Sequence, residues 1–221
     1  MKQKNFTSKH FKSWTRSQSL TTATTGTATS VTFSTANGRF GQGGGFNGST
    51  SKIVFGNIHS FASSDAFSFN VWMKTTMSTF GHIIDKQSGA TGNKGYLFEI
   101  FTGGKFNFGM RTSGGDFLGW QSDTAVNDGE WHMLTITKST SLTGVTLYLD
   151  GKVEGATQGG NGTVSDITNS EQFTIGLRNQ DGGSPFSGSI DDVAIFNKEL
   201  TADEVKSIYI QTAGSFFFNF I

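Results

Sequence analysis

The stretch NDGEWHMLTITKSTSLTGVTLYLDGK, residues 127–152, contains the pattern that decides the fold. Asp128, Glu130 and His132 lie close together in it, and carboxylates beside a histidine are typical of general acid–base catalysis. The residues that follow alternate between apolar and polar side chains, as in a half-buried β-strand. Asp150-Gly151 then follows the apolar run VTLYL, and Asp-Gly favours the tip of a two-residue hairpin. The question is whether this stretch is a catalytic strand or a sheet scaffold.

The spacing of the side chains favours the scaffold. Alternation places His132, Leu134 and Ile136 on one face of a strand, so we expect His132 to be a hydrogen-bonded histidine of the core. The two acidic residues fall in the turn before the strand. Trp131, a large apolar side chain, is expected to close one end of that core.

Outward from this stretch, the chain repeats short apolar segments separated by turns. Its 221 residues include 30 Gly, 22 Phe and one Pro, and no window approaches the roughly 20 apolar residues of a membrane span. The strand-like segments are SKIVF (51–55), AFSFNVWMKT (66–75), HIIDK (82–86), YLFEIF (96–101), KFNFGMR (105–111), WHMLTIT (131–137), VTLYLD (145–150), QFTIG (172–176) and GSIDDVAIF (188–196). We predict an all-β fold, a single antiparallel β-sandwich over residues 20–213.

One short helix is predicted near the C-terminal end, in TADEVKSIY (201–209). Thr201 is its expected N-cap, and Glu204 three positions later completes a capping box. Its apolar face consists of Val205, Ile208 and Tyr209.

Both ends of the chain are expected to extend beyond the sandwich. Residues 1–64 hold seven Lys or Arg and no acidic residue, whereas residues 65–221 hold ten basic and seventeen acidic residues. Such asymmetry indicates a basic arm, residues 1–19, that is either a contact segment or a solvated tail. The Phe-rich residues 214–221 are either a closing strand or an apolar tail that docks into a partner. The N-terminal residues have no apolar run of the kind a secretory signal requires.

Six motifs occur in series along most of the chain. They are GGFNGSTSKIVF (44–55), FSFNVWMK (67–74), VNDGEWHMLTIT (126–137), VTLYLDGKV (145–153), FTIG (173–176) and FSGSIDDVAIFNKELTADEV (186–205). Over roughly residues 38–210 the chain resembles the laminin G-like domains of the concanavalin A-like lectin/glucanase superfamily. The resemblance implies a jelly roll, with Trp131-His132 as a structural marker rather than a catalytic pair.

Glycoside hydrolases share this jelly roll, so a hydrolytic site has to be considered. A retaining hydrolase needs two carboxylates about 5 to 5.5 Å apart, which a Glu-x-Asp-x-x-Glu pattern on one strand supplies. That pattern is absent from the sequence. The glycine-rich segment GRFGQGGGFNG (38–48) lacks the Gly-Lys-Ser/Thr ending of a phosphate loop. We therefore expect no enzymatic activity.

Carbohydrate recognition needs an aromatic platform and planar polar side chains. Two segments supply such residues, RTSGGDFLGWQSD (111–123) and GLRNQDGGSPF (176–186). The candidate ligand-binding residues are Arg111, Asp116, Trp120, Arg178, Asn179, Gln180 and Asp181. The alternative is that Trp120 packs in the core and the polar loop residues are only solvated.

The resemblance also suggests one ion site. In related jelly rolls an Asp at the start of the last long strand and carbonyl oxygens of an early turn hold a structural Ca²⁺. By residue type these correspond to Asp191 and the turn around Gly48. The alternative is that Asp191 only hydrogen-bonds a turn.

From these features we predict a non-catalytic, surface-exposed attachment module. The first hypothesis is a decoration, fibre or capsid-associated protein on the surface of a phage or virus particle. Residues 1–19 and 214–221 would then contact neighbouring subunits, and the sandwich would bind a host glycan or receptor. The alternative is a free carbohydrate-binding module of a bacterial cell-surface system, outside the cell. We expect neither nucleic acid nor membrane as a partner, and a homo-oligomer is compatible with either hypothesis.

Overall fold

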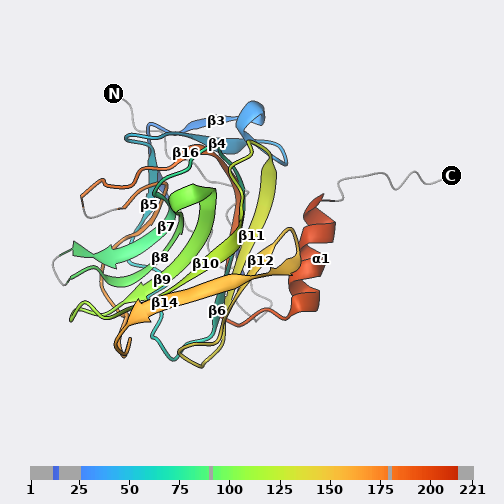
Figure 1. The fold of residues 1–221 in the computed structure, drawn as a ribbon. Coiled ribbons are helices and arrows are strands. Elements are labelled where there is room, and N and C mark those ends of the chain that lie inside the picture. Colours follow the sequence, from blue (N-terminus) through green and yellow to red (C-terminus); the bar gives the residue numbers. More distant parts are fainter. Residues whose placement is uncertain (1–11, 15–25, 90–91, 179–180, 214–221) are drawn as a thin grey trace.

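The computed structural model describes residues 12–14, 26–89, 92–178 and 181–213. Within these residues the chain forms two β-sheets packed face to face, with one α-helix outside the sandwich (Figure 1). The predicted antiparallel β-sandwich with one short helix is confirmed. The proposed arm and tail lie outside the described residues, except for Lys12–Trp14.

The first sheet has β6 and β11 near its middle. Its strands, in spatial order, are β13 (Lys152–Glu154), β12 (Val145–Leu149), β11 (Trp131–Lys138), β6 (Phe67–Lys74), β16 (Ser187–Phe196), β4 (Gly43–Asn47) and β3 (Thr32–Ser34). β1 (Lys12–Trp14) pairs in parallel with Ala194–Phe196 of β16, and so belongs to this sheet. A 3₁₀ turn, η1 (Thr35–Asn37), joins β3 to β4.

The second sheet ends at β14 on one side and at β2 on the other. Its order is β14 (Ala156–Asn161), β10 (Phe117–Ala125), β9 (Lys105–Arg111), β8 (Lys94–Ile100), β7 (Gly81–Ser88), β15 (Phe173–Ile175), β5 (Lys52–Phe55) and β2 (Thr27–Thr29). η3 (Thr102–Gly104) joins β8 to β9. All nine predicted strands are present, and the nine did not include β1–β4, β10, β13 or β14.

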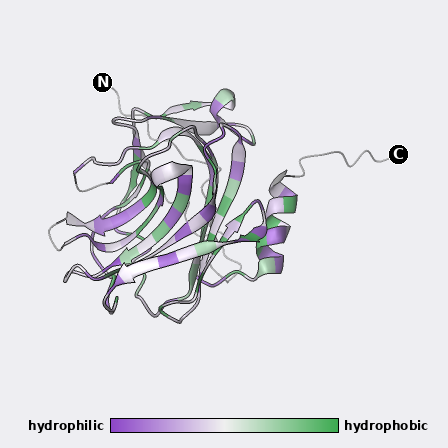
Figure 2. Cartoon of the chain, viewed as in Figure 1, coloured by the Kyte–Doolittle hydropathy of each residue, from purple (hydrophilic) through white to green (hydrophobic). Residues whose placement is uncertain are grey.

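The core between the sheets is rich in aromatic rings. Phe61 and Phe67 stack with ring centroids 4.5 Å apart, and Phe69 lies 5.4 Å from Tyr96 across the sandwich. Alternation along β6 and β8 directs Phe67, Phe69 and Tyr96 inward, and Figure 2 shows such alternation as purple and green bands along the ribbons. Burial of such rings is a large favourable contribution to folding.

Helix α1 (Ala202–Ala213) covers the outer face of the first sheet. The capping box is confirmed: the amide of Glu204 donates to Thr201 Oγ1 at 3.2 Å, and the amide of Thr201 donates to Glu204 Oε2 at 3.0 Å. The predicted apolar face packs as expected, in a second cluster made of Trp72, Met133, Tyr148, Leu200 and Val205, with Phe40, Trp131, Phe196, Ile208 and Tyr209 against it. Among the described residues, no helix is long and apolar enough to cross a membrane.

A buried lysine secures the loop at one end of the sandwich. The ammonium group of Lys138 donates to the backbone oxygens of Ser63, Asp65 and Ser139 at 2.6, 3.0 and 2.8 Å. It also lies 5.6 Å from the ring centre of Phe67. Three carbonyl oxygens thus converge on one charge and fix the loop before β6.

Candidate functional site

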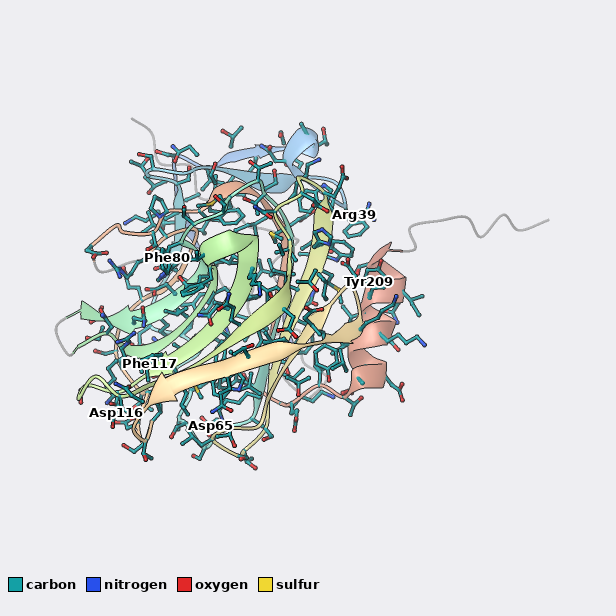
Figure 3. All side chains as sticks on the ribbon, in the orientation of Figure 1. Arg39, Asp65, Phe80, Asp116, Phe117 and Tyr209 are labelled. Carbon is teal, nitrogen blue, oxygen red and sulfur yellow. The ribbon has the colours of Figure 1, made fainter. Side chains whose placement is uncertain are left out.

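The outer face of the second sheet is open to solvent over β9, β10 and β14. Along β9, core residues such as Phe108 alternate with outward residues that are partly exposed, and β10 repeats the pattern through Gln121. All six residues of β14 are exposed. We call this surface the open face. Figure 3 shows Phe117 and Asp116 there, on the opposite side of the molecule from Tyr209 of α1.

The strand register arranges the outward side chains of the open face in three rows. Each row crosses β9, β10 and β14 in that order. The amide row is Asn107, Gln121 and Thr157. The glycine strip is Gly109, Gly119 and Gly159. The arginine row is Arg111, Phe117 and Asn161.

The glycine strip leaves the sheet backbone uncovered between the other two rows. A Cβ added at Gly159 would meet no atom within 4 Å, and those added at Gly109 and Gly119 would have their nearest neighbours at 3.6 and 3.5 Å. Asn107 and Arg111 are four residues apart on one strand, which separates the flanking rows by about 13 Å. A flat ligand can therefore approach the backbone with polar side chains on both sides.

The amide row offers both hydrogen-bond donors and acceptors. Asn107 Nδ2 donates to Glu99 Oε1 at 3.1 Å, which fixes the orientation of that amide. Asn107 Oδ1 lies 3.5 Å from the Cβ position at Gly119 and so faces the glycine strip. Gln121 is the next side chain along the row and is partly exposed. Such planar amides suit ligands that carry many hydroxyl groups.

The arginine row combines a cation with an aromatic ring. The guanidinium carbon of Arg111 lies 5.0 Å from the ring centre of Phe117. The amide of Phe117 donates to Asn161 Oδ1 at 3.1 Å, which connects β10 to β14 at this row. Asp116 lies in the preceding turn, next to Gly162, so Arg111 and Asp116 of the first predicted set do come together at one end of the open face.

Beyond the amide row lies a buried histidine between two carboxylates. His82 Nδ1 is 3.2 Å from Asp85 Oδ2, and His82 Nε2 is 3.3 Å from Glu99 Oε2. Burial alone would lower the pKa of His82, but the hydrogen bonds and charges of Asp85 and Glu99 outweigh it and raise that pKa to about 9. The imidazole is therefore protonated at neutral pH and connects β7 to β8.

A β-bulge makes this cluster possible. His82 and Asp85 are three positions apart, so a regular strand would direct them to opposite faces. The register between β7 and β8 shifts between His82 and Ile84, which returns Asp85 to the same side as His82. Asp85 is 0% exposed and Glu99 is 5% exposed. A substrate therefore has little access to either carboxylate.

Arg178 and Asp181 of the second predicted set bind each other. Arg178 Nε donates to Asp181 Oδ1 at 2.8 Å, and Nη2 donates to Oδ2 at 2.6 Å. These hydrogen bonds raise the pKa of Arg178, as do the charges of Asp85 and Glu99 nearby. One edge of the guanidinium is thus occupied by its own loop. Asn179 and Gln180 lie outside the described residues.

Trp120 does not belong to the open face. It is 4% exposed, points into the core, and stacks on Phe108 with ring centroids 6.2 Å apart. The prediction that Trp120 is a platform for a sugar ring is wrong. Trp120 is two residues after Leu118 on β10, so both side chains point to the core face of the sheet. Phe117, whose side chain points to the other face, is the partly exposed aromatic residue of this strand.

Comparison with protein families identifies the fold. Residues 47–206 match a laminin G model described as the concanavalin A-like lectin/glucanases superfamily. The chain belongs to this superfamily. The resemblance seen in the sequence motifs is thereby confirmed. The laminin G-like chain matches none of the curated proteins compared with it.

Solved structures with the same jelly roll include neurotoxin binding domains. The botulinum neurotoxin serotype G binding domain is similar with a TM-score of 0.66 and 19% identity, covering 88% of this chain and 48% of that one. For the serotype D binding domain the TM-score is 0.63 and the identity 17%, over 86% and 48% of the two chains. The laminin G-like chain thus spans less than half the length of these structures, and at such identities the likeness shows the fold alone.

The predicted calcium ligands do not fit a calcium site. Asp191 Oδ2 accepts hydrogen bonds from the amides of Arg39 and Phe40 at 2.8 and 3.0 Å, and Oδ1 accepts one from Asp192 at 2.9 Å. Amide donors around a carboxylate take the place of a cation. The strand pairing also separates Gly48 from Asp191. Asn47, which precedes Gly48, pairs with Ser187 of β16, and Ser187 is four residues before Asp191. Asp191 therefore holds a turn, which was the alternative.

No other described group replaces that predicted site. Among the described residues, no three His, Asp or Glu side chains are grouped so as to hold a metal ion. The imidazole of His82 lies between its two carboxylates, one at each ring nitrogen, so the three groups do not converge on one point.

The acidic stretch around His132 is part of the scaffold, but His132 is not a core residue. Its side chain is 17% exposed, with Nδ1 2.9 Å from Asp150 Oδ2 and Nε2 3.2 Å from Asp128 Oδ1. The hydrogen bond to Asp150 is the main reason that the pKa of His132 is raised. Asp150 is the hairpin tip, with φ of 50°, so these contacts hold the turn before β11 against the turn after β12. Trp131 packs beneath α1 instead of closing the core.

Several residues of the open face and of the buried cluster beside it were not predicted from the sequence. On the open face they are Asn107, Phe117, Gln121, Thr157 and Asn161, and in the buried cluster they are His82, Asp85 and Glu99. The alternation of Leu118 and Trp120 was a usable signal, because it places Gly119 and Gln121 on the other face. No local signal joins Thr157 to Gln121, since their pairing depends on strand register.

Proposed function

We propose that the chain is a non-catalytic binding module that recognises a glycan on its open face. The observation that carries the proposal is the register of β9, β10 and β14, which aligns an amide row and an arginine row on either side of uncovered backbone. Membership of a lectin-like superfamily is consistent with it.

The chemistry of the rows suits a neutral or weakly charged sugar. Amides such as Asn107 and Gln121 donate to and accept from hydroxyl groups, and the ring of Phe117 offers an apolar surface for the C–H face of a sugar. Arg111 adds one positive charge, and Asp116 in the adjacent turn opposes it with one negative charge. We therefore expect hydroxyl recognition, rather than ion pairing, to supply most of the specificity.

The non-catalytic part of the proposal is supported by the state of the paired carboxylates beside the amide row. Asp85 and Glu99 are both buried and both bonded to protonated His82. Glycoside hydrolysis needs two accessible carboxyl groups on either side of the scissile bond. A carboxylate that is bound to an imidazolium is a poor general base.

A glycan array of the full chain, run with calcium and again with EDTA, tests this function. We expect binding to a defined sugar in both conditions, and several-fold weaker binding by Arg111→Ala and Gln121→Ala. Lys152→Ala is the matched control, because Lys152 is exposed on β13 of the first sheet. An empty array with folded protein, or equal binding by all variants, would refute a glycan site on the open face.

We further propose, as the cellular setting, that the module is carried on the surface of a phage or virus particle. The support is the basic character of the N-terminal residues, which suits attachment to an acidic neighbouring subunit. Deletion of residues 1–11, which retains β1, should then abolish incorporation into particles and leave glycan binding intact. Unchanged incorporation would favour a free module at a cell surface.

A further inference from the structure

β14 is an unprotected edge of the second sheet. It is the terminal strand, it pairs with β10 on one side, and all six of its residues are exposed. An edge strand presents unpaired backbone N–H and C=O groups, which are a template for pairing with another strand. Its sequence, ATQGGN, contains neither a charged residue nor proline.

The other described sheet edges carry the protection that β14 lacks. β13 has only three residues, two of which are the charged Lys152 and Glu154. β2 and β3 are also only three residues long. Short strands and charged side chains are the usual means of preventing edge-to-edge association. β14 is twice as long as any of these and has neither a charge nor a proline.

We propose that β14 pairs with β14 of a second copy of this chain, antiparallel and about a two-fold axis. Such an interface is self-complementary, because each copy contributes the same strand. β14 carries no charge, and the whole chain has a formal net charge of zero, so two copies have no net repulsion. The paired strand would continue the second sheet across the dimer.

The side chains of β14 favour a register with Gly159 opposite Gly159. In that register Gln158 faces Gly160, which has no side chain, and Thr157 faces Asn161. Shifting by one residue would place Gln158 against itself and crowd two long side chains.

The consequence for the open face is that the second copy extends it. With a two-fold axis normal to the sheet, the two open faces point the same way and their glycine strips are collinear. The distance between Gly109 of one copy and Gly109 of the other is five strand spacings, or about 24 Å. The amide row of one copy then continues into the arginine row of the other. This use of the dimer rests on the proposed function, whereas the pairing itself does not.

Pairing of a six-residue strand forms a small interface. Stable complexes bury about 1,200–2,000 Å² in total, and an edge contact of this length is at the low end. We therefore expect weak, concentration-dependent association, and the test uses cross-linking as well as sedimentation.

Cysteine cross-linking tests the pairing directly, because the natural sequence contains no cysteine. Gly159→Cys introduces a thiol where a Cβ meets nothing within 4 Å, and Gly56→Cys is a matched control with the same open space. Cα atoms paired across antiparallel strands are about 4.5–5.5 Å apart, which a disulfide can bridge. We expect Gly159→Cys to form disulfide-linked dimers at least about tenfold faster than Gly56→Cys, because pairing raises the effective concentration.

Sedimentation of two charge variants checks the same interface without a new covalent bond. Gln158→Lys and Gln158→Glu should each be monomeric at concentrations where the natural chain associates, and a mixture of the two should associate again. Both measurements are made without glycan, so failure of the proposed function leaves them informative.

Two outcomes would overturn the proposal. Self-pairing is refuted if the chain stays monomeric at all concentrations and Gly159→Cys and Gly56→Cys cross-link equally. The edge strand β14 would then pair with an extended segment of a different protein. Faster cross-linking of Gln158→Cys than of Gly159→Cys would refute the register and, with it, the collinear glycine strips.

Discussion

The two sheets share one core, but their outer faces differ completely. On the first sheet the outward side chains of β6, β11 and β12 include Trp72, Met133 and Tyr148, and α1 covers them. On the second sheet the outward positions of β9, β10 and β14 hold amides, glycines and Arg111, and they are open to solvent. The outward residues of a strand therefore determine whether its sheet acquires a cover or remains available for a ligand.

The comparison also shows where stability and recognition are located. Residues under α1 remove apolar surface from water, and each is expected to contribute to the free energy of unfolding. Residues of the open face make few intramolecular contacts, so their substitution should change ligand binding with little change in stability. The following predictions test this division, from the largest expected effect to the smallest.

The largest effect is expected from Trp72→Ala on the helix-covered face. Trp72 is 1% exposed, its Nε1 donates to Thr212 Oγ1 at 3.0 Å, and its ring lies 5.8 Å from that of Tyr209. Removing a buried Trp costs about 3–5 kcal/mol. Chemical denaturation should show this loss, whereas Phe117→Ala on the open face should cost much less. Equal losses would contradict the division.

The second effect is a pH dependence of stability, which is caused by His82 beside the open face. The pKa of His82 is about 9 in the folded chain and 6.5 when unfolded, so its contribution is complete below pH 6.5 and is lost as the pH rises through 9. A shift of this size corresponds to a contribution on the order of 3 kcal/mol. The stability advantage of the natural chain over His82→Gln should therefore shrink over this range.

The variant comparison is needed because a second buried group titrates nearby. Burial lowers the pKa of Lys86 to about 8, so deprotonation of Lys86 stabilises the fold as the pH rises. This effect is common to the natural chain and His82→Gln, and it cancels in their difference. A difference that stays constant from pH 6 to pH 10 would exclude the proposed ionisation of His82.

A smaller effect is expected from the cap of the covering helix. Thr201→Ala removes the hydroxyl that accepts from the amide of Glu204 and should cost about 1 kcal/mol. Ser207→Ala is the control, since it removes a hydroxyl from the same helix without removing a cap. Thermal unfolding of the two variants should differ in this direction. The reverse order would show that α1 does not depend on its capping box.

The smallest effect on stability is expected from Gln121→Ala, in the centre of the amide row. Substitution of such a partly exposed side chain changes the free energy of unfolding by less than about 0.5 kcal/mol. Affinity for the bound glycan should nevertheless fall several-fold, because each hydrogen bond contributes roughly 0.5–1.5 kcal/mol. Isothermal calorimetry measures this directly. A large loss of stability with unchanged affinity would reverse the assignment of the two faces.

Local patterns were sufficient to predict most of the sandwich and the helix. The alternation in FSFNVWMK located β6, and the spacing of Thr201 and Glu204 predicted the start of α1. β14 escaped prediction because ATQGGN has no alternation and only one apolar residue, Ala156, so its strand conformation depends on pairing with β10. β10 escaped because its glycine-rich surroundings suggested a loop.

The site depended on features that are not local in sequence. Asp85 shares a face with His82 because of the bulge after His82, and a strand pattern alone predicts the opposite. Asn107 and Thr157 meet in one row through two successive strand pairings, although fifty positions separate them. Trp120 was proposed as a sugar platform from its residue type alone, without asking which face of β10 its side chain points to.

The ammonium group of Lys138 takes the place that a dissolved cation has in some other loops. Loop carbonyls that converge on a dissolved ion depend on the supply of that ion and release it on dilution. Here the cation is attached to the chain, 2.6 Å from the carbonyl of Ser63, so it can be neither chelated nor exchanged. The loop that precedes β6 therefore needs no dissolved cation to hold its carbonyl groups together.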